Sequence, residues 1–509
     1  MNGRSQRPAR RAAAALLAVS AAALAILTAI PAVREANLSV SRTSEIRIPK
    51  RKLAPFARQF VSNLPILDVV AENDVLPGPE EAPAPAVLRV FDRAGENRLR
   101  DRPRALLPFT TVRYRGESSM IRQFRQHSIR LQILNGKRKP SRFDLCGLPA
   151  DDDFALVANY MDRSLIRDRL VYELAAPLLP GTPRGRYAEV FLRKAGAQLD
   201  EYTYRGVFLV LQKISAGADR VPVGRLAMAP PDGLRGGGWI IQGDKSAATN
   251  RPSFWLDGGL YSIASPGARD TPPEAVAWIR DDFSRFYGVL KADPPDARLF
   301  ELVDVESFVR LMLLQELVKN NDAFRWSAYY HRAAGGKLEA GPPWDFNLSV
   351  GNNPLRGGPE GFLLPHFPVA GWLLRDPRVF ALFRERWREL RLPGAAFSDD
   401  RIRALVAGLA AELGPAADRH FRKYPELLDP SCRFPLTARY EARTFDQHVR
   451  IVRDFLLKRA HWLDVALAAA RKPEDLVSPE MERVAADSRA HGVDWWVEAD
   501  SPPVQGVPR

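Results

Sequence analysis

The sequence predicts an α+β protein, with a sheet-rich part over residues 86–215 and a mainly helical part over residues 216–470. Two observations predict it. In the first part, short segments alternate apolar and polar residues, which is typical of strands. In the second part, apolar residues recur every three or four positions over several segments, which is typical of amphipathic helices. The 509 residues are enough for two or three domains.

The sheet-rich part is predicted from strand-like segments on both sides of one helical segment. The strand-like segments are 86–92, 110–116, 127–136, 187–193 and 204–214. The last two, joined by a polar loop, form a predicted hairpin. Within 156–181, apolar residues from Leu165 to Leu174 recur at helical spacing, and a Pro-Gly pair ends the pattern. Strands, one helix and more strands describe a small α+β unit.

The helical part is predicted from one buried helix and three amphipathic helices. Asp304 is the predicted N-cap of a helix that extends to residue 320, and its middle is apolar nearly all round, which indicates burial. The segment 328–341 predicts a hairpin about a Gly-Gly pair. The amphipathic helices are predicted over 379–391, 402–413 and 445–470. Residues 216–300, which Gly and Pro interrupt, show no clear pattern.

Residues 1–35 carry the pattern of an export signal. Four Arg residues precede an uncharged run over 12–33 that consists mostly of Ala and Leu. Basic residues before an apolar segment predict a cytoplasmic N-terminus and an exported remainder. The run is long enough for one membrane crossing, and small residues at its end would also allow cleavage. Both a signal peptide and an uncleaved anchor are therefore open, with the anchor slightly favoured.

Two further segments are predicted to lie outside the folded parts. Residues 36–85 are rich in Pro and charge and include the run PGPEEAPAP, which predicts an extended linker. Residues 471–509 are predicted to form a C-terminal tail. The predicted location of the protein is the cell envelope or the outside of the cell, with membrane contact through the N-terminal segment only.

Composition and motifs exclude some classes of function. The net charge of +14 suits anionic partners such as nucleotides, although an Arg-rich soluble protein is the simpler explanation. No nucleic-acid-binding pattern occurs, so no nucleic-acid partner is predicted. The sequence has no GxSxG and no HExxH, which gives no support to nucleophile-elbow hydrolases or HExxH zinc proteases. Cys146 and Cys432 lie far apart, and two separate thiols are favoured over one long-range disulfide.

Two aspartates are candidates for phosphoryl-transfer chemistry. In the stretch GPPWDFNLSVGN, Asp345 and Asn347 would share a face if the segment is extended, and could supply two oxygen ligands for Mg²⁺. Asp322 follows the buried helix, and the hairpin then returns the chain to Asp345, so both carboxylates are expected at the same end of one lobe. One acid would hold the metal and Asp322 would serve the attacking hydroxyl. Alternatively, Asp322 caps a turn and Asp345 binds backbone amides.

Three basic side chains in the sheet-rich part are candidates for nucleotide binding. Arg115 follows one predicted strand, and Arg130 lies on the next, on the face opposite its apolar neighbours. Lys213 lies at the end of the last strand-like segment of this part. The expected contact is with phosphate oxygens. A solvated sheet face is the alternative.

Six phrases of the sequence recur in the order and spacing of a known family. They are RYRGESS (113–119), HSIRLQI (127–133), LVANYMDRSLIRDRLVYELA (156–175), YRGVFLVLQKI (204–214), DVESFVRLMLLQELVKNND (304–322) and GPPWDFNLSVGN (341–352). Together they resemble the spore coat protein H (CotH) kinase family, over most of the chain. No single phrase is decisive, but six in series are specific.

The resemblance implies an atypical protein-kinase-like fold of two lobes, a small sheet-rich N-lobe and a mainly helical C-lobe, with a nucleotide between them. It implies a catalytic-loop role for Asp322 and a metal-binding role for Asp345. Members of the family transfer phosphate from ATP to Ser or Thr of partner proteins at spore or cell surfaces, and other members act as adhesins. The expected cofactors are thus Mg²⁺ and ATP, and the expected partner is a protein substrate at the envelope.

The sequence departs from the family pattern at charged positions. Asn347 stands where a second acid is common, Gln212 where Glu is common, and Gln126-His127 where a Lys pair is common. Each departure removes a charge that such catalysis relies on. The expected function is a CotH-like protein kinase, and the alternative is a catalytically weak or inactive surface binding or scaffold protein. Transfer of phosphate or nucleotide to a glycan or lipid is a third, weaker option.

Overall fold

The computed structural model describes residues 53–477. Within this range it does not describe residues 117–123, 225, 227, 230–232, 235–237, 245–250, 354–357 and 433–436. The predicted export segment over 1–35, the first part of the predicted linker and nearly all of the predicted tail lie outside the described residues. No helix in the described part of the chain has both the length and the apolar character needed to cross a bilayer.

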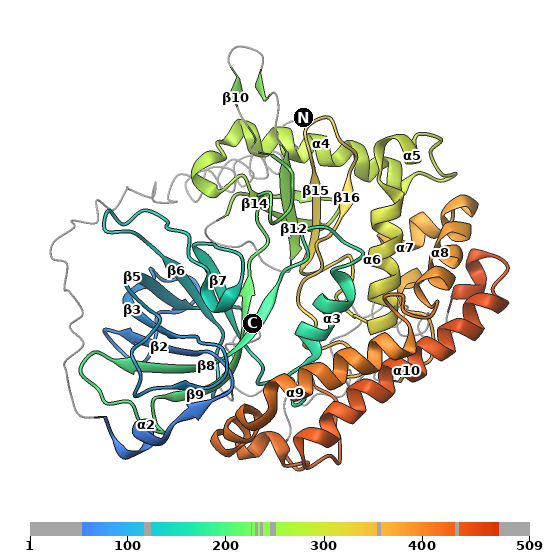
Figure 1. Ribbon diagram of the computed structural model, residues 1–509. Helices are drawn as coiled ribbons and strands as arrows, with labels where there is room; N and C mark the ends of the chain where they lie inside the picture. The colour runs from blue at the N-terminus through green and yellow to red at the C-terminus, as the bar shows by residue number, and fades with distance from the viewer. Residues whose placement is uncertain are drawn as a thin grey trace, which may run out of the picture. The chain divides into compact units, whose positions relative to one another are not determined.

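The first region of the chain is a closed barrel of seven strands (Figure 1). The strands are β2 (Ile66–Ala71), β3 (Ala84–Phe91), β5 (Ala105–Tyr114), β6 (Ile129–Ile133), β7 (Asp153–Ala158), β8 (Gly185–Lys194) and β9 (Tyr204–Gln212). Their order around the barrel is β2-β3-β5-β6-β7-β9-β8. The parallel pairing of β2 with β8 closes the barrel, and the other neighbours are antiparallel. Closure leaves the barrel without a free sheet edge.

The alternation predicted from the sequence sets the two faces of the barrel strands. In β6, Ile129, Leu131 and Ile133 are buried, whereas Arg130 and Gln132 between them are half-buried. Strands β8 and β9 are instead buried almost throughout, because α3 (Arg167–Ala175) packs against β8 and α9 (Asp399–Lys423) against β9. The predicted hairpin over these two strands is confirmed.

The predicted linker over 36–85 is wrong for its second half. Strand β2 is buried at every position and pairs with both β3 and β8, so it is a structural part of the barrel. Its inner side chains pack in the barrel, while Ile66 packs outside it with Phe60, which follows α2 (Pro55–Gln59). The six residues ILDVVA are too short to stand out beside the Pro-rich run that follows them. Two short strands, β1 (Val61–Ser62) and β4 (Asn97–Arg98), pair nearby.

The helix predicted within 156–181 is shorter than its apolar pattern. Strand β7 occupies the beginning of this segment and pairs with both β6 and β9. The carboxylate of Asp162 then accepts hydrogen bonds from the main-chain nitrogens of Ser164 (2.9 Å) and Arg167 (2.8 Å), which shapes the turn before α3. Only nine residues, from Arg167, are helical. An apolar run that is buried on both faces does not distinguish a strand from a helix by itself.

The second region contains a sheet that the sequence pattern largely missed. Its five strands are β12 (Trp239–Asp244), β13 (Ser253–Leu256), β14 (Gly259–Ser265), β15 (Ala328–Arg332) and β16 (Glu339–Ala340), in the order β13-β14-β12-β15-β16. Only the hairpin of β15 and β16 was predicted, and it is confirmed. The other three strands lie in the Gly- and Pro-interrupted segment. A small pair, β10 (Met228–Ala229) with β11 (Gly233–Leu234), precedes them.

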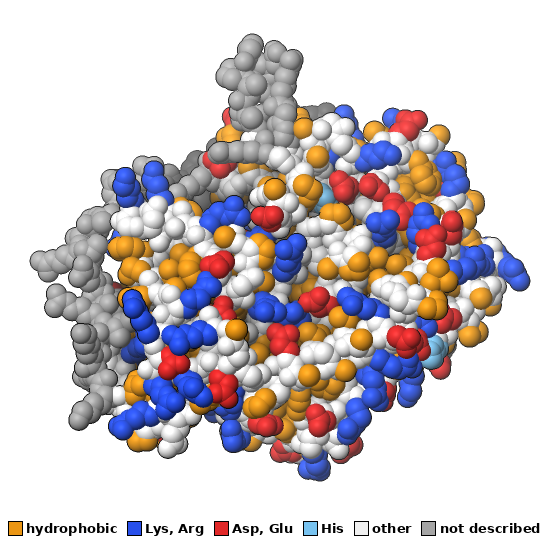
Figure 2. Space-filling view, in the orientation of Figure 1, with side chains coloured by type: hydrophobic (Ala, Val, Ile, Leu, Met, Phe, Trp, Pro, Cys, Tyr) orange, Lys and Arg blue, Asp and Glu red, His pale blue; other side chains and the backbone are white. Residues whose placement is uncertain are grey.

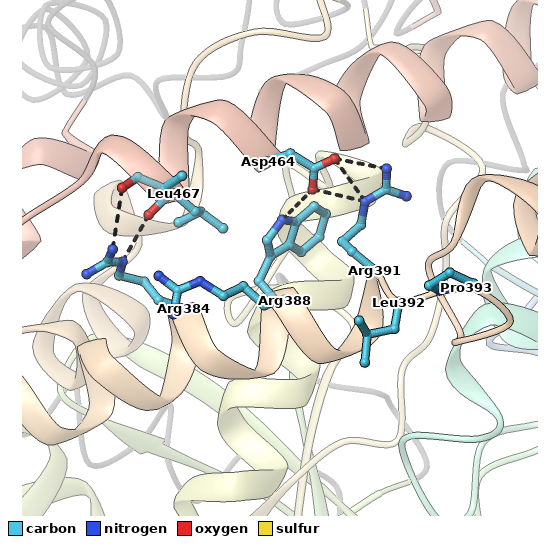
Figure 3. Close-up of a pocket in the computed structure, with 9 residues that line it drawn as sticks. Arg384, Arg388, Arg391, Leu392, Pro393, Asp464 and Leu467 are labelled. Carbon is cyan, nitrogen blue, oxygen red and sulfur yellow. Dashed lines mark hydrogen bonds and ion pairs between the residues drawn. The ribbon is translucent and has the colours of Figure 1, made fainter.

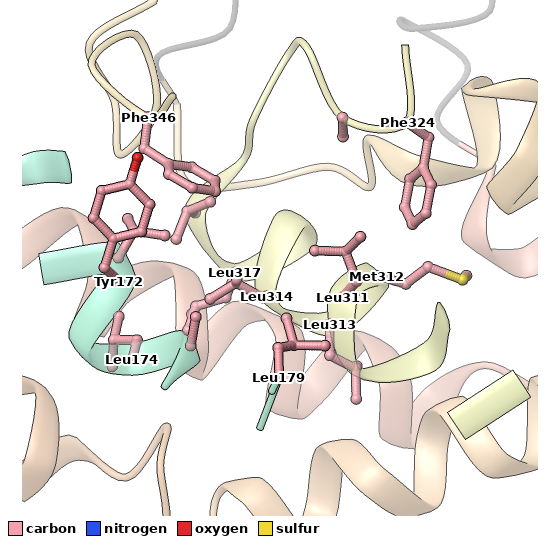
Figure 4. Packing of buried hydrophobic residues seen from close by; sticks show 14 of the residues in the cluster. Tyr172, Leu174, Leu179, Leu311, Met312, Leu313, Leu314, Leu317, Phe324 and Phe346 are labelled. Carbon is pink, nitrogen blue, oxygen red and sulfur yellow. The ribbon is translucent and has the colours of Figure 1, made fainter. Parts of the chain in front are cut away.

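The predicted helices of the second region are confirmed, and α6 is at their centre. The remaining helices are α4 (Pro273–Lys291), α5 (Leu299–Leu302), α6 (Val305–Val318), α7 (Pro368–Leu374), α8 (Pro377–Leu390) and α10 (Phe445–Ala469). Asp304 caps α6 by accepting a hydrogen bond from Ser307 N (3.1 Å), as predicted. Figure 4 shows the leucines of α6 packed among side chains of α3 and the loop after β16. Mixed sheets and helices confirm the α+β class, and the two-lobed kinase-like arrangement stays a prediction.

Helix α9 connects the helical region to the barrel. Its residue Gly414 has a positive φ of 40°, and the helix changes direction there. Beyond this kink, Arg419 pairs with Glu189 of β8, which is fully buried, and Nδ1 of His420 accepts a hydrogen bond from Val207 N of β9 (3.1 Å). Burial lowers the pKa of His420 to about 3, so the ring stays neutral and its Nδ1 remains an acceptor.

The two cysteines are both free thiols, as favoured from the sequence. Cys146 is buried beside the barrel core, and burial raises the pKa of its thiol well above the usual range. Cys432 is half-buried in the second region. A thiol whose pKa is raised by burial is a poor nucleophile, so Cys146 is a core residue of the barrel.

Candidate active site

A small cavity lies where the barrel, α3 and the loop after β16 meet. Its polar lining includes Arg115 from the end of β5, Asp168 and Tyr172 from α3, and Asp345 and Asn347 from the loop. Its volume is about 80 Å³, which admits a few water molecules or an ion with part of a ligand. We call it the carboxylate cavity. Three of the six predicted site residues, Arg115, Asp345 and Asn347, are thus brought together.

The loop that carries Asp345 is not extended, so the condition under which Asp345 and Asn347 would share one face of a strand is not met. Asp345 has a positive φ of 67°, so the strand-like alternation does not hold. Phe346 is fully buried, whereas Trp344 lines the cavity next to Asp345 and Asn347. The two polar side chains therefore share a cavity because the backbone turns, and not because alternate residues share one face of a strand.

The loop is held on α3 and the turn before it. Phe346 N donates a hydrogen bond to Asp168 Oδ1 (2.7 Å), and Asp345 N donates to the hydroxyl of Tyr172 (3.2 Å). Asn352 Nδ2 donates to Met161 O (3.0 Å). The two phrases that contain DRSLIRD and WDFN are therefore in direct contact, although more than 160 residues separate them in the sequence. These contacts fix the main chain at Asp345, and therefore the position from which its side chain enters the cavity.

Asp168 is a candidate site residue that was not predicted from the sequence. It is 5% exposed, and burial together with the negative charge of Asp345 raises its pKa to about 8, although the hydrogen bond from Phe346 N opposes this. A strongly perturbed carboxyl group in a cavity is a candidate functional group. The signal in the sequence was the acid at the end of DRSLIRD, between the apolar residues Ile166 and Leu170.

Arg115 is the cation of the carboxylate cavity. Burial lowers the pKa of its guanidinium, and the carboxylate of Asp345 opposes this shift. The guanidinium lies over the ring of Trp344, with its Cζ 5.5 Å from the ring centroid. Arg115 N donates to Ser128 O (2.9 Å), which ties this end of β5 to the start of β6. One guanidinium thus shares the cavity with two carboxyl groups.

Arg130 and Lys213 do not line the carboxylate cavity. Both pair with Asp153 of β7, Arg130 Nη2 at 2.7 Å and Lys213 Nζ at 2.7 Å. Burial would raise the pKa of Asp153, but Lys213 and Arg130 lower it to about 2. Burial lowers the pKa of Lys213 to about 8. The two cations therefore already share one carboxylate, and their predicted contact with phosphate stays a prediction.

Asp322 is also outside the lining of the carboxylate cavity. It lies in the turn after α6, where its main-chain oxygen accepts hydrogen bonds from Arg325 N (3.1 Å) and Trp326 N (3.0 Å). Its own nitrogen donates to Asn320 Oδ1 (3.1 Å). The pair that the structure places around one cavity is Asp168 with Asp345, and not Asp322 with Asp345. The catalytic role of Asp322 stays a prediction.

Gln212 and Gln126, which stand where the family pattern has charged residues, have different surroundings. Gln212 is buried, accepts a hydrogen bond from Arg184 N (3.2 Å) and donates to Pro149 O (3.4 Å). Gln126 lines the carboxylate cavity, and its Nε2 donates to Arg205 O and Val207 O, both at 2.9 Å. The Oε1 of Gln126 is buried and has no hydrogen-bond partner among the described residues. Gln126 therefore offers an unused acceptor at the cavity.

Comparison with known families agrees with the resemblance found in the sequence. The model of the CotH kinase protein family matches residues 112–463. The matched range contains the named lining residues of the carboxylate cavity, together with Asp322, Arg130 and Lys213. No curated protein matches the chain. Because the family model covers about two thirds of the sequence, the chain belongs to the CotH kinase protein family.

Proposed function

We propose that this protein is a phosphotransferase that uses ATP and Mg²⁺ and acts on Ser or Thr hydroxyls of envelope proteins. The observation that carries the proposal is the pair of carboxyl groups, Asp168 and Asp345, that faces Arg115 in one cavity. Phosphoryl transfer depends mainly on positioning and on charge stabilisation, and these residues supply both signs of charge at one place.

The donor set of the carboxylate cavity fits a magnesium ion. Asp168 and Asp345 offer carboxylate oxygens and Asn347 offers an amide oxygen, which are hard donors. No group of three or more His, Cys, Asp or Glu side chains suited to a metal occurs within the described ranges. Mg²⁺ is commonly held by one or two carboxylates, with waters and substrate phosphates completing its shell. The bound ion would neutralise charge on the transferred phosphate.

The side chains around the ion would position the nucleotide. Arg115 would pair with a phosphate oxygen, and its position over the ring of Trp344 supports this by holding the guanidinium in the cavity. The unused Oε1 of Gln126 would accept a hydrogen bond from a hydroxyl or amino group of the ligand. Asp322 would orient or deprotonate the acceptor hydroxyl, as the resemblance implies. The acceptor protein would then extend from the turn after α6 to the cavity.

The location proposed for this reaction is the cell envelope, through the export pattern of residues 1–35. On the face shown in Figure 2, basic side chains are interspersed with acidic ones, which supports a nucleotide and protein substrate over a long polyanion. Activity of a reporter that works only outside the cytoplasm, fused after Arg509, tests the location. A reporter active only in the cytoplasm would overturn it.

A binding protein without turnover is the second candidate. Asn347 and Gln126 are neutral where the family pattern carries charge, and Arg130 and Lys213 share Asp153. Fewer charges at the cavity would weaken catalysis more than they weaken binding. In that case the protein would bind a nucleotide or a partner at the envelope without transferring phosphate.

Magnesium-dependent ATP consumption and autophosphorylation separate the two candidates. We expect Asp345→Asn to lower the rate at least about 100-fold, because it removes the negative charge of a proposed metal ligand. Asp322→Asn should abolish transfer while leaving nucleotide binding intact. Asp400→Asn is the matched control, since its side chain is 91% exposed on α9. Equal turnover in wild type and Asp345→Asn would eliminate the enzymatic proposal, and binding without turnover in wild type would favour the second candidate.

A further inference from the structure

A second cavity, of about 340 Å³, lies between α8 and α10 (Figure 3). Its lining shares no residue with the carboxylate cavity. Three arginines of α8 and the residue that follows it, Arg384, Arg388 and Arg391, are four and three positions apart, so they lie along one side of the helix. We call this cavity the arginine groove.

Two of the three arginines make hydrogen bonds or ion pairs with residues of α10. Arg384 Nε donates to Leu467 O (2.9 Å), near the C-terminal end of that helix. Arg391 pairs with Asp464 (2.9 Å) and with Asp399 of α9 (2.8 Å). Asp464 is the only carboxylate in the described lining of the groove, and it also accepts a hydrogen bond from Trp387 Nε1 (2.9 Å). These contacts hold α8 against α10, and they engage Asp464, the only carboxylate in the described lining.

Arg388 lies between the two occupied arginines in Figure 3 and has no such partner. Its side chain is exposed and makes no hydrogen bond or ion pair with any residue that the structure describes. Leu392, at the edge of the groove, is 59% exposed, and Pro393 lies next to it. A cation beside an exposed apolar edge fits a ligand that combines a carboxylate with a large apolar side chain.

The chain itself contains a segment of this chemistry. Residues 494–500 read DWWVEAD, with three acids and two tryptophans. Residues 478–509 hold six Asp and Glu against three Arg, in a chain whose net charge is +14. The sign of charge in this part of the sequence is therefore opposite to that of the whole chain and complementary to the groove.

The covalent connection is long enough to reach. Val477 comes nine residues after Ala468, which lines the groove, so these two lie at most about 32 Å apart. Asp494 comes seventeen residues after Val477, and this stretch spans up to about 56 Å when extended. Tethering of this kind gives a local concentration in the millimolar range, which favours this segment over a separate partner of the same chemistry.

We propose that the arginine groove binds the chain's own segment 494–500. Arg388 pairs with a carboxylate of the segment, and its tryptophans contact the apolar edge at Leu392 and Pro393. The interaction is intramolecular and independent of the proposed phosphotransferase activity. It would cover the exposed apolar edge of α8 and complete the charge pairing of the groove.

Hydrogen exchange of the full-length protein, followed by mass spectrometry, tests this contact. In wild type, residues 494–500 and the C-terminal turn of α8 should both be protected. Arg388→Glu should speed exchange of both segments at least fivefold, and so should the combined substitutions Asp494→Lys, Glu498→Lys and Asp500→Lys. Joining both changes should restore protection, because the charges are then exchanged. Arg422→Glu, an exposed arginine on α9, is the matched control and should change neither segment.

Other outcomes would overturn the proposal. Exchange of 494–500 that is unprotected in wild type, or that Arg388→Glu does not change, would show that the groove does not hold this segment. Protection that falls on dilution would assign the segment to a second copy of the chain. Because charge reversal can disturb α8, Arg388→Ala and the melting temperature of each variant accompany the measurement, and a loss of protection counts only where that temperature is unchanged.

Discussion

Two buried carboxyl groups of this protein, Glu316 on α6 and Asp168 on α3, have opposite surroundings. Glu316 accepts hydrogen bonds from Leu363 N (2.9 Å) and Leu364 N (2.8 Å) and pairs with Arg459, whose side chain is fully buried. Asp168 accepts a hydrogen bond from Phe346 N and lies near a second acid, Asp345. The first carboxylate is balanced in charge and the second is not.

The difference separates a structural ion pair from a candidate binding group. A buried carboxylate that has a counter-charge and hydrogen bonds to both oxygens stays ionised. A bound cation would gain little further stabilisation from it. A buried acid that is close to another acid is destabilised in its charged form, so a cation would be bound there favourably. Depth of burial alone does not distinguish the two, because both side chains are at most 5% exposed.

Removing Glu316 from its ion pair with Arg459 should have the largest effect on the stability of the fold. Glu316→Ala leaves Arg459 buried without a counter-charge and leaves two main-chain donors unpaired, so we expect the free energy of unfolding to fall by about 3–5 kcal/mol. Denaturant unfolding measures this. Glu385→Ala, whose side chain is 62% exposed on α8, is the control and should change stability by less than about 0.5 kcal/mol. A small effect of Glu316→Ala would mean that the pair is not structural.

The pH dependence of Mg²⁺ affinity should reveal the unbalanced pair. The pKa of Asp168 is raised to about 8, so protons compete with the ion below that pH. We expect the affinity to weaken by up to about tenfold for each pH unit between 8 and 6, and to level off above pH 8. Isothermal titration calorimetry over this range measures it. An affinity that is flat from pH 6 to pH 8 would contradict a role for Asp168 in holding the ion.

Neutralising the unbalanced acid should have a smaller effect of the opposite sign on stability. The folded-state pKa of Asp168 lies above its unfolded value, so its stability contribution is greatest at acid pH and is lost as pH rises toward about 8. Asp168→Asn keeps the acceptor for Phe346 N and should add about 1–2 kcal/mol to the free energy of unfolding at pH 8 without metal, with a gap that widens from pH 4 to pH 8. Denaturant unfolding at each pH measures the gap. Added Mg²⁺ should stabilise wild type and not the variant.

The helices and the barrel strands were largely predictable, because their apolar periodicity reflects one buried face. The cap at Asp304 and the hairpin of β15 and β16 followed from local residue preferences. Strand β2 was missed because it lies beside the Pro-rich run, and β12, β13 and β14 were missed because Gly and Pro interrupt their segment. The pairings of β2 with β8 and of β12 with β15 join residues far apart in the sequence. Local pattern carries no information about such partners.

The candidate site was also predictable only in part, because local pattern identifies single residues but not their distant neighbours. Arg115, Asp345 and Asn347 belong to phrases with a strong family pattern, and the cavity contains all three. Asp168 was missed because its role depends on a neighbour, Asp345, that lies 177 residues further along the chain. Chain order suggested that Asp322 would join Asp345, but the turn after α6 is outside the cavity lining.

The kink of α9 at Gly414 has a mechanical consequence. Arg115 follows barrel strand β5, Asp168 lies on α3, which packs against both β8 and α9, and Asp345 lies on the loop after β16. The second half of α9 contacts the barrel through Glu189 of β8 and through the main chain of β9. Because α9 also packs against α3, we expect substitutions in α9, although far from any ligand, to change the spacing between Arg115 and the two carboxyl groups.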